Sequence, residues 1–299
     1  MSDGTRSGKP LVVTDDAIRA LVDDQFPHLA DQELGRRYTL EDHFAIRIGD
    51  HHGALFPRYV DDDFLFARAA DLLAPHLERW TFPVSAPTAT GRPGHGYPCH
   101  WTLVDWVSAS TAGFVPLQGE SAGLLGAALR QIHTPAPPAS PANPRTSPRL
   151  ADLLPEWERL LAGAVHRGAP ENRVLDVDAA TAMFRDGVDA SLDAGWSWTH
   201  GRIEPRALMS DRGHFCGILI WQNFGAGDPA ADLGGAATAI PLEMLADLHA
   251  GYGGVSPTTA RRARSYQLLA ALGYVEIDDP FLARLAWERM IELGLVGEA

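Results

Sequence analysis

The sequence predicts an α+β protein of two lobes, a small strand-rich N-terminal lobe and a helical C-terminal lobe. Strand-like alternation is concentrated in the first third of the chain, at 44–48 and at 101–106. The remainder carries apolar residues mostly at helical spacing. We place the N-terminal lobe and its last strand at residues 1–106 and the C-terminal lobe at residues 107–299.

In the N-terminal lobe, apolar residues share one face over about 15–27, which predicts a helix. The strand at 44–48 precedes a turn at 50–53. Asp61–Asp63 opens a second helix that reaches Leu77. Acidic residues are favoured at a helix N-terminus, so we interpret the triple Asp as a helix cap rather than a metal site.

The C-terminal lobe contains a series of helical patterns and, by our interpretation, one short strand pair. A stretch with six prolines at 134–148 is a loop. Pro257 and Pro280 each follow a capping residue, as is common in the first turn of a helix. Gly251–Gly254 is the C-terminal stop of a helix. The predicted helices are 121–133, 149–165, 179–193, 241–251, 257–272 and 280–294.

Composition excludes several classes of function. The formal net charge of −13 argues against nucleic acid and anionic membranes as partners, because both bind basic surfaces. We expect a cytoplasmic protein, since the N-terminus lacks an apolar signal region and no apolar run is long enough to span a bilayer. Two cysteines form no disulfide framework. The Ala, Arg, Gly and Pro content suggests a high-GC genome such as that of an actinobacterium.

No motif for a metal or an organic cofactor is present. The twelve histidines have no zinc-ligand spacing, and no GxSxG elbow or dinucleotide fingerprint occurs. We therefore predict no cofactor and no metal. The expected partner is a small-molecule ligand or substrate, and the sequence leaves the oligomeric state open.

The most informative segments are Thr199–Leu208, Gly217–Trp221 and Gly227–Leu233. Their order and spacing resemble the aminoglycoside phosphotransferase family, which has His-Gly-Asp, four residues and Asn, then a strand ending in Asp-Trp, then Gly-Asp-Pro and a further Asp. The resemblance implies a bilobal protein-kinase-like fold.

The residues that carry chemistry in that family are replaced in this sequence. Arg202 stands at the position of the base Asp, Ala207 at that of the metal-binding Asn, and Ile220 at that of the metal-binding Asp. A guanidinium stays protonated and cannot act as a base. Ala and Ile offer no oxygen ligand, which Mg²⁺ requires. We therefore predict a degenerate member of the family.

The N-terminal lobe also lacks expected parts. The resemblance implies that Arg47 approaches nucleotide phosphates with a Glu partner in the helix 63–77. That helix has no Glu before Glu78, and Phe66 or Ala67 occupies the expected place. The hairpin region 30–43 is short and has one glycine. We predict that the phosphate cradle is missing.

The polar residues of the segment 200–207, which we call the altered loop, form our candidate site. We propose Glu204 as an acid–base group, Arg202 and Arg206 as donors to an anionic or carbonyl oxygen, His200 as a proton shuttle and His214 as a further contact. The alternative is that Arg202 forms an internal salt bridge with Glu204 or Asp232 and fills the cleft that is the catalytic site in the family. His200 also has a structural alternative, a hydrogen bond to the backbone.

Four further candidates for substrate binding lie elsewhere. Trp101, Asp105 and Trp106 belong to the strand that leads into the hinge between the lobes, and Gln222 follows Trp221. The alternative for the two tryptophans is a place in the hydrophobic core.

Three functions are compatible with these residues. The first is an enzyme whose cleft is repurposed for non-phosphoryl chemistry on a small molecule, as in bacterial specialised metabolism. The second, nearly equal, is a binding or regulatory pseudo-phosphotransferase. The third is an active small-molecule kinase with relocated catalytic groups.

Overall fold

The computed structural model describes residues 9–193 and 195–298. It divides into two compact units. The N-terminal unit extends to Ser108 and also includes Ile218–Gln222, and the C-terminal unit consists of Ala109–Gly217 and the chain from Asn223 onward. Within the described ranges, no helix combines the length and the apolar character needed to cross a membrane.

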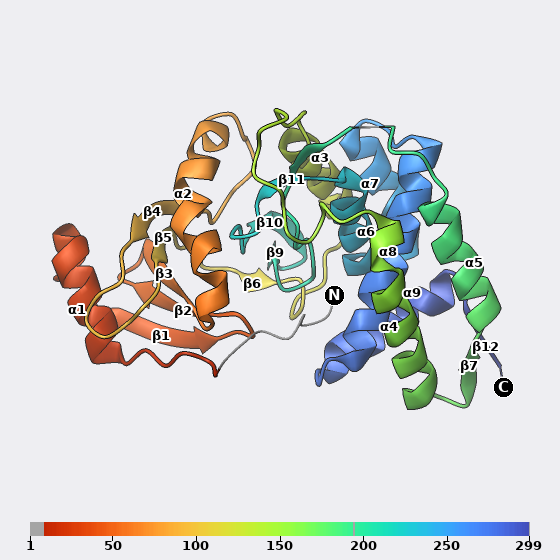
Figure 1. Cartoon of the computed structure of the whole chain (residues 1–299), viewed down its shortest axis with the longest axis horizontal. Helices are drawn as coiled ribbons and strands as arrows, with labels where there is room; N and C mark the ends of the chain where they lie inside the picture. The colour runs from red at the N-terminus through yellow and green to blue at the C-terminus, as the bar shows by residue number, and fades with distance from the viewer. Residues whose placement is uncertain (1–8, 194, 299) are drawn as a thin grey trace. The chain divides into compact units, whose positions relative to one another are not determined.

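The N-terminal unit is built on an antiparallel sheet of five strands in the order β1-β2-β3-β5-β4 (Figure 1). Two α-helices accompany it, and both were predicted. The elements are α1 (Asp15–Gln25), β1 (Leu34–Thr39), β2 (His43–Ile48), β3 (His52–Pro57), α2 (Asp63–Leu77), β4 (Pro87–Gly91) and β5 (Trp101–Asp105), with 3-10 turns at Pro27–Leu29 and Val60–Asp62.

The two faces of this sheet bury different sets of side chains. On one face, α1 packs its apolar side chains against Phe44, Ile46 and Ile48 of β2. On the other face, α2 packs Leu65 and Phe66 against residues with the opposite side-chain direction. Successive strand residues point to opposite faces, so this division follows from the two-residue period of a strand.

The acidic start of α2 differs from the predicted cap. Asp62 occupies the N-cap position, but its side chain makes no capping hydrogen bond. The Asp63 carboxylate instead accepts hydrogen bonds from the backbone N–H of His100 at 2.6 Å and from its ring Nδ1 at 3.0 Å. Asp63 thus joins α2 to the segment before β5.

The segment Ile218–Gln222 packs on the N-terminal unit through aromatic stacking. Trp221 stacks on Trp80 with ring centroids 4.9 Å apart, and its indole Nε1 donates to the carbonyl oxygen of Ile218 at 2.9 Å. The backbone N–H of Ser85 donates to the same carbonyl oxygen at 3.2 Å. Through Trp221, this segment packs on Trp80 of the N-terminal unit.

The C-terminal unit is a group of helices around α6 and α8. The central helix α8 packs against α4, α5, α6 and α9, and α3 packs against α7. All the predicted helices are present, with bounds shifted by a few residues. The α-helices of this unit are α3 (Ser121–Ile132), α4 (Leu154–Arg167), α5 (Val177–Val188), α6 (Pro229–Ala239), α7 (Leu245–Tyr252), α8 (Pro257–Glu276) and α9 (Pro280–Glu292), with 3-10 turns at Leu150–Leu153 and Leu242–Met244.

Helix ends in this unit follow the predicted capping chemistry. The side chain of Ser256 accepts from the backbone N–H of Thr259, and Asp279 caps α9 in the same way. Gly253 ends α7 in the left-handed conformation with φ of 91°, which glycine adopts without steric cost.

The C-terminal unit has more strands than the single pair that the sequence suggested. Its strands form one sheet in the order β10-β9-β6 and two pairs, β11-β8 and β12-β7. Most have only two to four residues, too few for a clear alternating pattern. They are β6 (Ser110–Thr111), β7 (Arg173–Leu175), β8 (Ser197–Thr199), β9 (Leu208–Asp211), β10 (His214–Ile218), β11 (Gly225–Gly227) and β12 (Val296–Glu298).

Candidate functional site

The altered loop lies between β8 and β9 and is held by one buried carboxylate. Asp232, in the first turn of α6, accepts hydrogen bonds from the backbone N–H groups of His200 at 2.6 Å and Gly201 at 2.8 Å. Gly201 has φ of 83°, a conformation that most residues avoid. The loop therefore keeps a defined backbone shape.

A further layer of polar groups fixes Asp232 itself. His133 of α3 lies with Nε2 3.1 Å from Asp232 Oδ2 and with Nδ1 3.0 Å from the hydroxyl oxygen of Tyr252 on α7. Burial acts most strongly on Asp232 and raises its pKa, but the hydrogen bond from His133 and nearby positive charge outweigh it, so the net pKa is lowered. Burial raises the pKa of Tyr252 to about 12.

The side chain of His200 is part of this scaffold. It is fully buried, and its Nδ1 accepts a hydrogen bond from the backbone N–H of Arg202 at 3.1 Å. This contact is the backbone hydrogen bond that we gave as the structural alternative to a proton shuttle.

Arg202 forms a largely buried ion pair with Glu204. The Nε atom of Arg202 lies 2.8 Å from Glu204 Oε1, and the two side chains are only 7% and 17% exposed. A guanidinium and a carboxylate that satisfy each other in a buried position are both occupied. This geometry corresponds to the internal salt bridge that we considered as the alternative to an acid–base role for Glu204.

Arg206 and a buried tyrosine complete a charged cluster around this pair. Arg206 forms an ion pair with Asp279, the residue that caps α9. Tyr274 of α8 is buried, and burial followed by the charge of Glu204 raises its pKa, which Arg202 and Arg206 act to lower. Sequence reasoning missed Tyr274, because nothing in its local pattern connects α8 to a loop some seventy residues earlier.

One candidate residue, His214, lies apart from this cluster. His214 is exposed at the start of β10, and no contact in the described ranges links it to Arg202, Glu204 or Arg206. Asp228, the cap of α6, is held by the buried Arg262 of α8 through an Nε to Oδ2 distance of 2.8 Å. Asp228 therefore has a structural partner.

The residues present do not fit the magnesium ion that the kinase-like fold implies. Ala207 is fully buried and Ile220 is 6% exposed, so two of the family's metal-ligand positions carry apolar side chains in the interior. In the part of the chain that the structure describes, no group of three or more His, Cys, Asp or Glu is arranged to hold a metal ion. Mg²⁺ needs hard oxygen ligands, so these residues support no reaction step through this ion.

The contact between β3 and α2 in the N-terminal unit is apolar. In protein kinases a Lys on the third strand pairs with a Glu on the following helix, so the Lys must face that helix. In this chain, Leu55 faces α2 from β3 and packs in one apolar cluster with Phe66 and Leu65. An apolar contact therefore replaces the charged one, and Phe66 is one of the two residues that we predicted in the Glu position.

The structure corrects our assignment of Arg47. This residue lies on β2, one strand away from the position of the kinase Lys, and contacts its own hairpin. Its Nε donates to the carbonyl oxygen of Gly49 at 2.6 Å, and its guanidinium forms an ion pair with Asp50. The sequence did not separate the second strand from the third, because β3 is buried almost throughout and does not alternate.

The turn that would cover phosphates is short and acidic. β1 and β2 are joined by Leu40, Glu41 and Asp42, and the backbone N–H of Leu40 donates to the carbonyl oxygen of His43 at 2.9 Å. The turn has no glycine and carries two carboxylates, which repel a phosphate. The turn itself therefore offers no side chain with a positive charge to a phosphate.

The hinge-strand candidates occupy different environments. Trp101 is fully buried and stacks on Phe56 with ring centroids 4.9 Å apart, in the core beside α1. Asp105 is exposed at the end of β5. Trp106 is half-buried above Gly53, where an added Cβ would lie 2.5 Å from its indole ring. The indole of Trp106 thus covers β3 at Gly53.

Gln222 is the candidate with the most unusual environment. It is 5% exposed, and neither its Nε2 nor its Oε1 has a hydrogen-bond partner among the residues that the structure describes. Buried side-chain amides are paired in nearly all proteins, and an unpaired one requires an explanation. Gln222 lies two residues after Ile220, which itself has an unusual φ of 67°.

A five-stranded sheet with an α-helix between β3 and β4, followed by a helical unit with a braced His-Gly loop, defines a protein of the kinase-like phosphotransferase class. The model of the phosphotransferase enzyme family matches residues 36–266, and the chain belongs to this family. A search of curated protein sequences found no match.

Solved structures of antibiotic phosphotransferases share the fold. The GDP complex of wild-type aminoglycoside 2′-phosphotransferase-IIIa has a TM-score of 0.67 at 13% identity, over 94% of this chain and 99% of that one. The macrolide 2′-phosphotransferase MphH from Brachybacterium faecium has a TM-score of 0.57 at 18% identity, over 94% and 97%. The streptomycin–ATP–APH(2")-IIa complex has a TM-score of 0.58 at 11% identity, over 94% and 97%.

Proposed function

We propose that this protein binds a small molecule on a phosphotransferase fold and does not transfer phosphoryl groups. Of the three functions compatible with the sequence, the geometry favours the second. Arg202 and Glu204, which would perform new chemistry, form an ion pair with each other. The buried side-chain amide of Gln222, two residues after Ile220, has no hydrogen-bond partner among the described residues.

The absence of phosphoryl transfer is supported by both units independently. Transfer needs a cation near the phosphates, an oxygen-ligated metal ion and a base near the acceptor hydroxyl. Leu55 and Phe66 pack together where kinases have the Lys–Glu pair. Arg202, at the position of the base, is paired with Glu204. These differences argue against the third function, an active kinase.

The observation that carries the binding function is the unpaired amide of Gln222. An amide buried without a partner costs roughly 1–3 kcal/mol. A residue that lowers the stability of the fold in this way is typical of a functional site, where ligand binding is favoured over the stability of the free protein. A ligand with a donor and an acceptor would satisfy both atoms of this amide.

The class of ligand is suggested by charge and by the relatives. The structures with related folds include complexes with kanamycin, with streptomycin and with gentamicin. A net charge of −13 favours cationic ligands of this kind over polyanions. We also retain cytoplasmic location and a role in specialised metabolism as parts of this proposal.

One observation favours a repurposed enzyme as the second candidate. Glu204 lies beside Arg202 and close enough to Tyr274 to influence its pKa, so an acid, a cation and a phenol are grouped around one loop. Turnover with a steep pH dependence that Glu204→Gln abolishes would support this candidate, as would loss of turnover in Arg206→Ala.

The test compares two buried glutamines of equal exposure. Gln222 and Gln267 are both 5% exposed, but the Nε2 of Gln267 donates to the carbonyl oxygen of Ala237 at 3.1 Å. We expect Gln222→Leu to leave the free energy of unfolding unchanged or to raise it, and Gln267→Leu to lower it, because only the second loses a hydrogen bond.

The same variants are then tested with ligands. We expect one or more of kanamycin, gentamicin, streptomycin and a macrolide to raise the melting temperature of the wild type and not that of Gln222→Leu. ATP or GTP with Mg²⁺ should produce no rise and no phosphorylated product. Destabilisation by Gln222→Leu as large as that by Gln267→Leu, or phosphorylation of a panel member, would overturn the proposal.

A further inference from the structure

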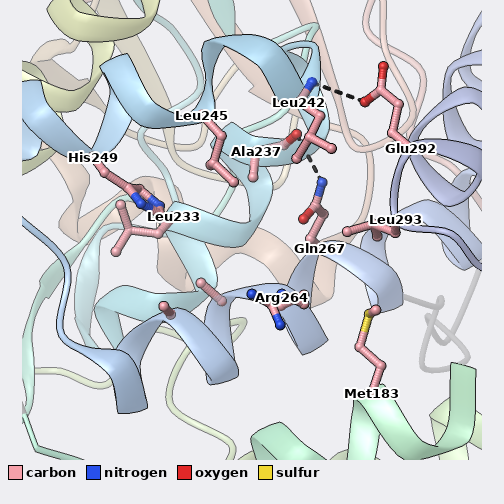
Figure 2. Close-up of a pocket in the computed structure, with 12 residues that line it drawn as sticks. Met183, Leu233, Ala237, Leu242, Leu245, His249, Arg264, Gln267, Glu292 and Leu293 are labelled. Carbon is pink, nitrogen blue, oxygen red and sulfur yellow. Dashed lines mark hydrogen bonds between the residues drawn. The ribbon is translucent and has the colours of Figure 1, made fainter. Parts of the chain in front are cut away.

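A cavity lies within the C-terminal unit. Its volume is about 260 Å³, and it is lined by residues of α5, α6, α7, α8 and the end of α9 (Figure 2). Small-molecule sites in proteins begin at roughly 300 Å³, so the cavity suits a ligand at the small end of that range.

The cavity and the loop lie on opposite sides of α6. A Cβ on Gly235 would lie 2.2 Å from the carbonyl oxygen of Ile203, so this side of α6 contacts the loop. Leu233 and Ala237 line the cavity and lie two residues away in either direction. Two residues correspond to about 200° around a helix, which places them on the far side.

The lining combines an apolar floor with one cation. Leu233, Ala237, Leu245 and Met183 provide apolar surface. Arg264 of α8 lines the same cavity and is exposed. It makes no hydrogen bond or ion pair with any residue in the described ranges, although the two other arginines of α8 do.

The two neighbouring arginines of α8 both form ion pairs with aspartates. Arg261 lies 2.7 Å from the carboxylate of Asp186, and Arg262 holds Asp228. The pKa of Asp186 is lowered mainly by its hydrogen bond from Arg261, and the positive charge of Arg264 lowers it further. The guanidinium of Arg264 therefore has no partner among the described residues and is accessible to a ligand.

Within the described ranges, no hydrogen bond or ion pair joins Arg264 to the other polar residues of the lining, which are Gln267, Glu292 and His249. Gln267 donates to the carbonyl oxygen of Ala237 at 3.1 Å, and Glu292 Oε2 accepts from the backbone N–H of Leu242 at 3.0 Å and from Arg289 at 2.7 Å. His249 is half-buried, and burial lowers its pKa, which favours a neutral ring that can donate one hydrogen bond.

We propose that this cavity binds a small monocarboxylic acid with a short apolar tail, with the carboxylate on Arg264 and the tail against Leu233, Ala237 and Leu245. A planar guanidinium pairs with a carboxylate through two parallel hydrogen bonds. A lining with one arginine and the carboxylate of Glu292 suits a ligand with one negative charge better than one with two, which distinguishes this ligand from a phosphate. This site is additional to the proposed ligand at Gln222.

The test uses hexanoate and phenylacetate as probes, with hexanamide and phenylacetamide as neutral counterparts of the same shape. We expect saturable binding of the acids by isothermal titration calorimetry, and binding of the amides at least ~10-fold weaker, because charged hydrogen bonds are the stronger kind. Arg264→Met should weaken the acids by a similar factor. Arg284→Met, which removes an exposed guanidinium from α9 outside the cavity, should not change their binding.

A second variant tests the position of the tail. Ala260 is half-buried on α8 and lines the cavity, so Ala260→Leu fills the space with a residue of good helix propensity. We expect it to abolish acid binding while the chain stays folded. Equal binding of acid and amide, undiminished binding by Arg264→Met or by Ala260→Leu, or no binding of either acid by the wild type would overturn the proposal.

Discussion

The ion pair between Arg202 and Glu204 allows a quantitative prediction. Replacing Arg202 by Met leaves the Glu204 carboxylate, which is only 17% exposed, without its partner at 2.8 Å. Breaking a buried ion pair from one side costs about 3–5 kcal/mol, because the remaining charge is desolvated and uncompensated. Glu204 keeps some contact with solvent, so we expect the lower end, about 3 kcal/mol.

A double variant separates the effect of the two charges from the effect of the side-chain volume. Arg202→Met with Glu204→Met removes both charges and keeps most of the volume, and such replacements are often neutral or stabilising. We therefore expect the double variant to be more stable than Arg202→Met alone. Arg284 provides the control, because its pair with Glu288 is 3.8 Å apart and its side chain is 69% exposed. Arg284→Met should change stability by less than ~0.5 kcal/mol.

The assay is chemical denaturation followed by far-ultraviolet circular dichroism, with one transition fitted for each unit if two are resolved. Thermal scans should show the same order, since about 3 kcal/mol corresponds to a fall of roughly 6–12 °C for a unit of this size. The reasoning is refuted if Arg202→Met lies within ~0.5 kcal/mol of the wild type, or if the double variant is the least stable of the set.

Three further predictions concern nucleotide chemistry and the brace of the loop. Arg202→Asp, Ala207→Asn and Ile220→Asp together should not produce ATP turnover, because the N-terminal unit still lacks its phosphate-binding groups; turnover in that triple variant would contradict this. Trp106→Ala should likewise show no stabilisation by ATP with Mg²⁺, whereas binding at a hundredfold excess over Kd would add about 2.7 kcal/mol. Asp232 has a lowered pKa in the fold, so its contribution to stability is present above its unfolded pKa and is lost as the pH falls through the folded value. Asp232→Asn should flatten that acid limb in denaturation measured against pH.

The helices were predictable because their periodicity is local. α1 and α3 match their predicted spans to within two residues, since the apolar residues of each recur on one face. β1 was not predicted, because its sequence, LGRRYT, is mostly exposed and polar. Its place in the sheet comes from pairing with β2, which is a tertiary property.

The candidate site was predictable only where its members are close in sequence. Arg202 and Glu204 are two residues apart, so their possible salt bridge could be foreseen. Asp279 could be recognised as a helix cap from the proline that follows it, but not as the partner of Arg206. The unpaired state of Gln222 could not be foreseen at all, because it depends on every group that the fold brings around it.

The backbone at Ile220 has a conformation that is unusual for its residue type. Its φ is 67°, in the left-handed region that costs most residues about 1–2 kcal/mol and a β-branched residue still more. Asp and Asn tolerate this region better than Ile does. The conformation at this position therefore suits an Asp, the residue that the resemblance implies there, better than the Ile of this chain.

This conclusion can be tested by comparing Ala with Gly at two buried isoleucines. Ile220 is 6% exposed and Ile218 is fully buried, and Ile218 has no positive φ. Ala and Gly lose nearly the same buried surface at either position, so their difference reports the backbone. At Ile218, in a strand, Gly should be less stable than Ala by roughly 0.5–1 kcal/mol. At Ile220, Gly should instead be more stable than Ala by about 1–2 kcal/mol. If Ala is the more stable substitution at both positions, the left-handed backbone at Ile220 carries no cost, and the argument for a retained frame at this residue fails.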